Sequence, residues 1–139
     1  TYGSFRRKLK ELIDENLLNF ISMDIKTNKE DYSKVAGVPV NIENIEKSIR
    51  LIMNNLEDYE FRTTILKKIH SREKVLQMAQ WPLELNSGKK VKKYSLQGFK
   101  NSGKLIDNGF SRYPNTPDSY LNDLKESIKD NFENIEVRY

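Results

Sequence analysis

The sequence predicts an α/β protein with about four parallel strands flanked by helices. Segments whose apolar residues recur every three or four positions alternate with short segments rich in aromatic and β-branched residues. Helix and strand follow each other four times, which is typical of parallel β/α units joined by right-handed crossovers. A chain of 139 residues fits one domain. This order fits an open sheet, and it also fits one side of a β/α barrel.

The first two predicted helices are identified by apolar spacing and by residues able to cap a helix. Apolar residues on one face predict a helix over 4–16, with Ser4 as a candidate N-cap. Isoleucines at helical spacing up to Met53 predict the next helix, which Asn41 or Asn44 could cap.

The remaining two helices carry both start and stop signals. Ser71 is the candidate cap of the third helix, which we expect to end at Pro82 because proline removes a hydrogen bond from a helix interior. Thr116 is the expected N-cap of the last helix, with Pro117 in its first turn.

The predicted strands are short and differ in how deeply they should be buried. A mostly apolar run with a polar tail indicates a buried first strand, and the second alternates with a period of two. The strands are expected at residues 17–26, 59–65, 92–99 and 135–139. A long loop is expected over 103–116.

Composition excludes several classes of function. The chain has no cysteine, which excludes disulfides, thiolate metal sites and a cysteine-ligated iron–sulfur cluster within these residues. No dinucleotide-binding glycine motif, Walker loop or Ser-His-Asp arrangement is present. No apolar stretch approaches the roughly 20 residues that cross a bilayer, so a cytoplasmic protein is the default expectation.

The charge pattern favours a solvated surface over a nucleic-acid site. The formal net charge is only +4, and the charges are interspersed. Basic residues concentrate at Lys89, Lys90, Lys92 and Lys93, where a solvated loop is the usual explanation.

Charged residues at the ends of the first two strands are the main candidates for a site. Ligands of parallel sheets gather at the carboxyl ends of the strands. Asp24 and Lys26 alternate with Ile25 and should project together, either toward a polar ligand or as a solvated salt bridge. Arg62 needs an anion or water, which could be a ligand carboxylate or phosphate, or a structural pair with Glu60 or Asp24.

The third strand and the single histidine add weaker candidates. Gln97 could bind the edge of a heterocycle, and Phe99 could stack on one or pack in the core. His70 lies between a strand and a helix cap, where a surface loop is favoured over a catalytic base.

Four segments of the chain together resemble one family in their order and spacing. They are Met23-Asp24-Ile25-Lys26, Asp58-Tyr59-Glu60-Phe61-Arg62-Thr63-Thr64, Leu96-Gln97-Gly98-Phe99-Lys100-Asn101-Ser102-Gly103 and Glu136-Val137-Arg138. The resemblance is to the carboxy-terminal half of the radical S-adenosylmethionine proteins that activate anaerobic ribonucleoside-triphosphate reductase, relatives of the pyruvate formate-lyase activators. It extends over nearly the whole chain.

The resemblance implies a partial (β/α)6 barrel in which a [4Fe-4S] cluster binds and reductively cleaves S-adenosylmethionine. The resulting 5′-deoxyadenosyl radical takes a hydrogen from a glycine of the partner, a glycyl-radical enzyme. By the same resemblance, Lys26 would contact the ribose or carboxylate of S-adenosylmethionine, and Arg62 would hold its methionyl carboxylate. Asp24 would arrange the site or a cation, and Gln97 would lie near the adenosyl group.

The cysteine motif of the family, CxxxCxxC, belongs to the amino-terminal half and is not among these residues. We therefore expect residues 1–139 to form one domain, the carboxy-terminal part of a barrel, inactive by itself and without bound cofactor or metal. The start at Thr1, within a Thr1–Gly3 segment similar to the end of a preceding strand, suggests a piece of a longer protein. An exposed barrel edge would allow a homodimer.

Two other functions remain open from the sequence. The chain could be a stand-alone basic interaction module for a protein or, less favoured, a nucleic acid. It could also belong to a radical S-adenosylmethionine enzyme with a different substrate.

Overall fold

Four parallel strands form the centre of the molecule and confirm the predicted α/β class. The computed structural model describes residues 2–17, 19–101 and 113–139. The strands are β1 (Phe20–Asp24), β2 (Asp58–Ile65), β3 (Val91–Gly98) and β4 (Phe132–Arg138), and they lie in the sheet in chain order. All three neighbouring pairs are parallel. The last strand begins at Phe132 rather than Ile135, and residues 103–112 of the expected loop lie outside the described residues.

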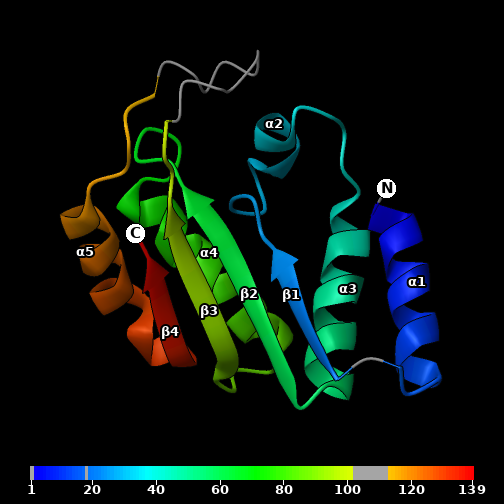
Figure 1. Cartoon of the computed structure of the whole chain (residues 1–139). Coiled ribbons are helices and arrows are strands. Elements are labelled where there is room, and N and C mark those ends of the chain that lie inside the picture. The colour runs from blue at the N-terminus through cyan, green and yellow to red at the C-terminus, as the bar shows by residue number, and fades with distance from the viewer. Residues whose placement is uncertain (1, 18, 102–112) are drawn as a thin grey trace.

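Four of the helices form one layer on one side of this sheet, and a short fifth one, α2 (Tyr32–Ala36), lies beyond the carboxyl end of β1 in Figure 1. The four are α1 (Tyr2–Asp14), α3 (Ile42–Asn55), α4 (Arg72–Leu85) and α5 (Asp118–Ile128), which continues into the 3-10 turn η2 (Lys129–Asn131). Helix α1 packs against α3, α3 against α4, and α4 against α5. Figure 1 shows α4 behind β2 and β3, with no helix in front of those strands. Strands in chain order with helices on one side are what right-handed crossovers produce when a sheet winds in one direction.

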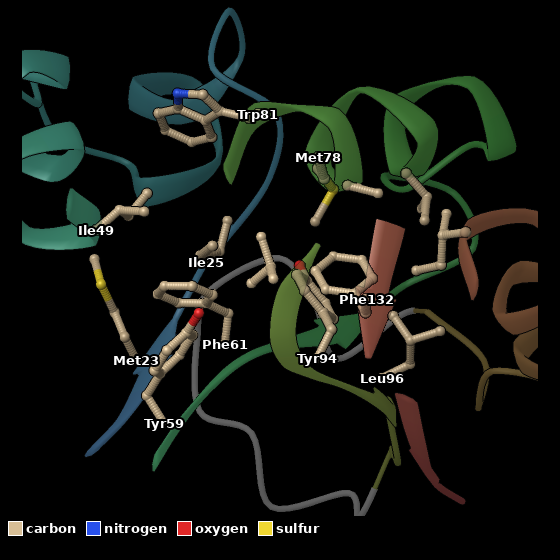
Figure 2. Close-up of a cluster of buried hydrophobic side chains, with 14 of the residues drawn as sticks. Met23, Ile25, Ile49, Tyr59, Phe61, Met78, Trp81, Tyr94, Leu96 and Phe132 are labelled. Carbon is tan, nitrogen blue, oxygen red and sulfur yellow. The ribbon is translucent and has the colours of Figure 1, made fainter. Parts of the chain in front are cut away.

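The core lies between the sheet and this helix layer. Every second residue of β2 and β3 points toward the helices, including Phe61, Tyr94 and Leu96, which are all buried. Figure 2 shows these side chains in one cluster with Met78 and Trp81 of α4. The polar atom of Tyr94 is satisfied within the core, because its hydroxyl contacts the Thr63 hydroxyl.

Two predicted helix caps are confirmed by their hydrogen bonds. The Asn41 side chain accepts from the Asn44 backbone N–H at 3.4 Å and caps α3. The Ser71 hydroxyl accepts from the Lys74 backbone N–H at 3.3 Å and caps α4. Both caps satisfy a backbone N–H that the first turn of a helix leaves without an intrahelical partner.

Three predictions about helix ends are wrong. Helix α1 begins at Tyr2, so Ser4 lies inside it and the first described residues are helical rather than the end of a strand. Helix α4 continues past Pro82 to Leu85, because the proline ring is buried in the core and costs only one hydrogen bond of the helix. Thr116 does not cap α5, since its hydroxyl donates instead to the Ile65 carbonyl.

The other face of the sheet, which we call the open face, is lined by polar side chains. Asp24, Arg62, Ser95 and Glu136 lie side by side in one row across the four strands, and Thr64, Gln97 and Arg138 form the next row. Parallel sheets normally bury both faces and have apolar residues on each. A polar open face therefore calls for a functional explanation.

Candidate functional site

The carboxyl ends of β1, β2 and β3 are tied together by buried hydrogen bonds. The Thr63 hydroxyl donates to the Ile25 carbonyl at 2.5 Å, and the Phe99 N–H donates to the Ile65 carbonyl at 3.2 Å. The Thr116 N–H donates to the Phe99 carbonyl at 3.0 Å, while its hydroxyl bonds Ile65. The backbone at this edge is therefore held in one arrangement, as a binding site requires.

A pocket of about 190 Å³, which we call the rim pocket, opens at this edge of the sheet. Its lining residues are Asp24, Lys26, Val35, Thr64, Leu66, His70 and Phe99. Apolar side chains and a few convergent polar groups are the usual lining of a small-molecule site. Two of the four residues predicted from the sequence, Asp24 and Lys26, line it.

Asp24 and Lys26 form an ion pair at the mouth of the pocket. The Lys26 ammonium lies 3.3 Å from the Asp24 carboxylate, and both side chains are a little over two-fifths exposed. Exposed pairs contribute little to stability. The pair is therefore available to exchange one partner for a ligand group at little cost.

Arg62 lies beside Asp24 in the register, on the same open face. Its other register neighbour is Ser95, and its side chain is exposed. Among the described residues, no hydrogen bond or ion pair engages its guanidinium. Neither of the structural pairs considered from the sequence, with Glu60 or with Asp24, is formed.

Gln97 lies on the open face but outside the rim pocket. It is exposed, one row nearer the carboxyl edge than Arg62, between Thr64 and Arg138. Phe99 is 7% exposed and lines the rim pocket, so both of its predicted roles, core packing and ligand contact, are compatible with its position. Asp24, Arg62 and Gln97 therefore share one face.

A buried carboxylate network on the open face was missed by the sequence analysis. Glu60 is only 3% exposed, and its two carboxylate oxygens accept five hydrogen bonds or ion-pair contacts. The Ser22 and Ser95 hydroxyls donate at 3.1 and 3.2 Å. The Arg138 guanidinium forks over both oxygens at 3.2 and 3.3 Å, and the Lys93 ammonium lies at 3.4 Å. We call these residues the Glu60 network.

The partners of Glu60 keep it ionised although it is buried. Burial by itself would raise its pKa, but the Ser22 hydrogen bond, the Arg138 charge and the remaining donors lower the pKa overall. Lys93 and Arg138 also bind Glu136, at 3.0 and 3.2 Å. The Glu136 contacts raise the pKa values of both cations. Lys93 thus lies in a strand, as the predicted strand 92–99 implied, and has two anionic partners; the alternative of a solvated loop is wrong for this lysine.

The network has a consequence for Arg62. Glu60 and Arg62 are two residues apart on β2 and face the same side, so Glu60 is the nearest candidate anion along the strand. Arg138 and Lys93 occupy both of its oxygens. Within the described part of the chain, the guanidinium of Arg62 is thereby left available on the open face. Only the spacing of Ser22, Glu60 and Arg138 on alternate positions of predicted strands could have signalled this arrangement.

His70 is buried, which corrects the expectation of a surface loop. It is 1% exposed and hydrogen-bonded through both ring nitrogens, to the Leu66 N–H and the Lys26 carbonyl. Burial lowers its pKa, more than the hydrogen bond to Lys26 raises it. The neutral ring is part of the structure of the rim.

Two further properties of the described residues concern groups of metal ligands and helices that could span a membrane. Within residues 2–17, 19–101 and 113–139, no group of three or more potential metal ligands comes together. Across the same residues, no helix has the length and apolar character needed to cross a membrane.

Comparisons with known proteins gave no relative. No family model matches the chain. No curated protein and no solved structure matches it either. The function of the chain is therefore inferred from its residues and their geometry.

Proposed function

We propose that this chain is the carboxy-terminal half of a partial (β/α)6 barrel from a radical S-adenosylmethionine enzyme that activates a glycyl-radical enzyme, with anaerobic ribonucleotide reductase as the partner. The observation that carries the proposal is the guanidinium of Arg62, which lies beside Asp24 on a polar sheet face and has no hydrogen bond or ion pair within residues 2–17, 19–101 and 113–139. In a β/α barrel the helices lie outside and one sheet face lines the interior. The single helix layer and the polar open face suit that arrangement.

The residues fit one end of S-adenosylmethionine. Its methionyl carboxylate is an anion that a forked guanidinium can bind with two hydrogen bonds, and no other described residue engages the guanidinium of Arg62. Lys26 and Asp24 offer opposite charges for the ribose hydroxyls and the amino group, and Gln97 offers an amide for the adenine edge. In the family, this cofactor supplies the adenosyl group from which the radical forms.

The residues do not fit the iron–sulfur cluster. The chain has no cysteine, so the CxxxCxxC ligands must belong to another segment. We assign no step of the reaction to this chain beyond binding and orienting the cofactor. The chain alone is inactive under this proposal, and its affinity for S-adenosylmethionine is weak, with a Kd of about 1 mM or more.

The first test is an NMR titration of the chain with millimolar S-adenosylmethionine. Shift changes are expected at Asp24, Lys26, Arg62 and Gln97. Arg62→Met should weaken binding roughly tenfold or more, because a charge-assisted forked contact is lost. Arg50→Met removes an exposed arginine of α3, on the helix side, and should leave binding unchanged. Micromolar binding to the wild-type chain, or equal loss in both variants, would contradict the proposal.

The second test uses the parent reading frame. Codons for CxxxCxxC upstream of Thr1 are expected, and the longer product, reconstituted with iron and sulfide and reduced, should release 5′-deoxyadenosine. Arg62→Met in that product should raise the concentration of S-adenosylmethionine needed for half-maximal release. A native start codon close to Thr1 would instead favour a stand-alone interaction module.

A further inference from the structure

His70 connects two strand ends that are far apart in sequence. Its Nε2 lies 2.7 Å from the carbonyl oxygen of Lys26, which follows β1, and its Nδ1 lies 3.0 Å from the N–H of Leu66, which follows β2. Its own carbonyl accepts from the Tyr120 hydroxyl of α5 at 2.5 Å. The imidazole is thus a bridge between segments that line the rim pocket.

These two partners specify the tautomer of the ring. The Leu66 N–H can only donate, so Nδ1 must carry a lone pair. The Lys26 carbonyl can only accept, so Nε2 must carry the hydrogen. A second proton on Nδ1 would point at the Leu66 N–H, and the ring cannot become an imidazolium without breaking that hydrogen bond.

The peptide that His70 holds is the one that bears Lys26. The Lys26 N–H donates to the Tyr32 hydroxyl at 3.2 Å, and the Lys26 carbonyl accepts from His70. Tyr32 and His70 therefore hold this residue from both sides of its Cα. The side chain that projects from this fixed backbone reaches Asp24 at 3.3 Å.

We propose that His70 is a positioning residue whose neutral imidazole holds the Lys26 peptide, and with it the Asp24–Lys26 pair, at the mouth of the rim pocket, and releases it on protonation. The identity of the ligand rests on the proposed function, but the positioning role does not. The role can be measured on the chain without any ligand.

Charged groups around the ring both raise and lower the pKa of His70. Lys74 of α4 disfavours the imidazolium, whereas Asp24 of β1 favours it. The ammonium of Lys26 pairs with Asp24, and from α5 the Tyr120 hydroxyl donates to the His70 carbonyl rather than to the ring. Burial is the largest influence and lowers the pKa of His70 from its ordinary 6.5. Release of the Lys26 peptide is therefore expected on the acid side of that value.

The first experiment needs no substitution, because His70 is the chain's single histidine. Long-range ¹H–¹⁵N spectra should show the Nε2–H tautomer at pH 7.5. On acidification, the Thr27 amide, which follows the Lys26 carbonyl, should shift in step with the ring. Hydrogen-exchange protection of the Leu66 amide should fall roughly tenfold over the same range, as one hydrogen bond is lost.

Two substitutions separate positioning of Lys26 from general support of the loop. His70→Gln places an amide NH₂ near Nε2, so it keeps the donor to Lys26 and loses the acceptor for Leu66. His70→Asn places a carbonyl near Nδ1, so it keeps the acceptor and loses the donor. The Lys26 and Thr27 signals should stay wild-type and lose their pH dependence in His70→Gln, but shift at every pH in His70→Asn.

The proposal is overturned by any of three results. One is an Nδ1–H tautomer at pH 7.5. Another is ionisation of His70 without a coupled change at Thr27. The third is a pair of variants whose Lys26 signals change equally, which would show that His70 supports the loop without selecting the position of Lys26. If a variant fails to fold, the wild-type titration still decides between the first two outcomes and the proposal.

Discussion

At the scale of single residues, Glu60 shows how a polar sheet face without a helix layer can still bury a carboxylate. A lone buried carboxylate would be costly, because its charged form loses hydration. Two serine hydroxyls and two cations replace that hydration from neighbouring strands, and their side chains also cover the carboxylate. The four strands of the open face are thereby joined through side chains as well as through the backbone ladder.

Glu60→Gln should lower the free energy of unfolding by about 2 kcal/mol at pH 7. The figure is below that for a fully buried pair because Arg138 and Lys93 are partly exposed and screened by solvent. Urea denaturation measures it, and Glu136→Gln is the matched control, since Glu136 shares the same two cations but is exposed. An equal loss in both variants would contradict the special role of Glu60.

The same comparison has a defined pH dependence. The pKa of Glu60 is lowered from its ordinary 4.5, so its contribution to stability is fully present above that value. It is lost as the pH falls through the folded-state pKa. The difference between wild type and Glu60→Gln should therefore be constant above pH 5 and shrink on further acidification, when both chains carry a neutral side chain.

At the scale of elements, helix starts were predictable where a local cap forms and not where a side chain bonds a distant segment. The side chains of Asn41 and Ser71 accept a hydrogen bond from the backbone N–H three residues ahead, so the local sequence is enough to predict the cap. Thr116 has the same local pattern, but its hydroxyl reaches the carbonyl of Ile65, 51 residues away. Sequence alone does not reveal that this carbonyl lies nearby.

Thr116 therefore gives a prediction that distinguishes a cap from a bridge between segments. Thr116→Val should lower the free energy of unfolding by roughly 1–2 kcal/mol, because the buried Ile65 carbonyl loses its hydroxyl donor. Thr116→Ser keeps the donor and should cost less. For a helix cap, Thr116→Asp would be as good as threonine. At this bridge it should be worse than valine, since a buried carboxylate would face a carbonyl oxygen; thermal melts of the three variants test the order.

At the scale of the whole molecule, the α/β class and the four parallel strands were predictable because hydrophobic periodicity records burial locally. The first and last residues of β1 and β4 were less predictable, since the ends of a strand depend on its pairing with neighbouring strands. The positions of Asp24, Lys26, Arg62 and Gln97 toward the carboxyl ends of the strands could be predicted, because the strand-end rule needs only the order of elements. Their role as a site stays a prediction. The burial of Glu60 and His70 could not be predicted, because it depends on distant partners. The hydrogen-bond partners of Glu60 are 35 to 78 residues away, and the carbonyl that His70 contacts is 44 residues away.

The sheet also has a free edge that bears on assembly. Ile25 N–H bonds the Arg62 carbonyl in β2, so the alternate residues Phe20, Ser22 and Asp24 direct their backbone groups away from β2. Among the described residues, no strand pairs with that side of β1. Large apolar side chains are exposed near the start of the strand: Leu12 at 39%, Leu17 at 65% and Phe20 at 45%. An unpaired edge beside exposed apolar residues favours association with another chain.

We therefore predict that the isolated chain forms homodimers through the β1 edge at high concentration. Phe20→Lys should shift the mass measured by light scattering to that of a monomer, because a charge at an edge strand opposes pairing and the exposed ring contributes little to the core. Leu76→Lys is the control, since Leu76 is 41% exposed on α4, in the helix layer behind β2 and β3 (Figure 1). A wild-type chain that stays strictly monomeric, or dimers lost equally in both variants, would rule out this edge as the interface.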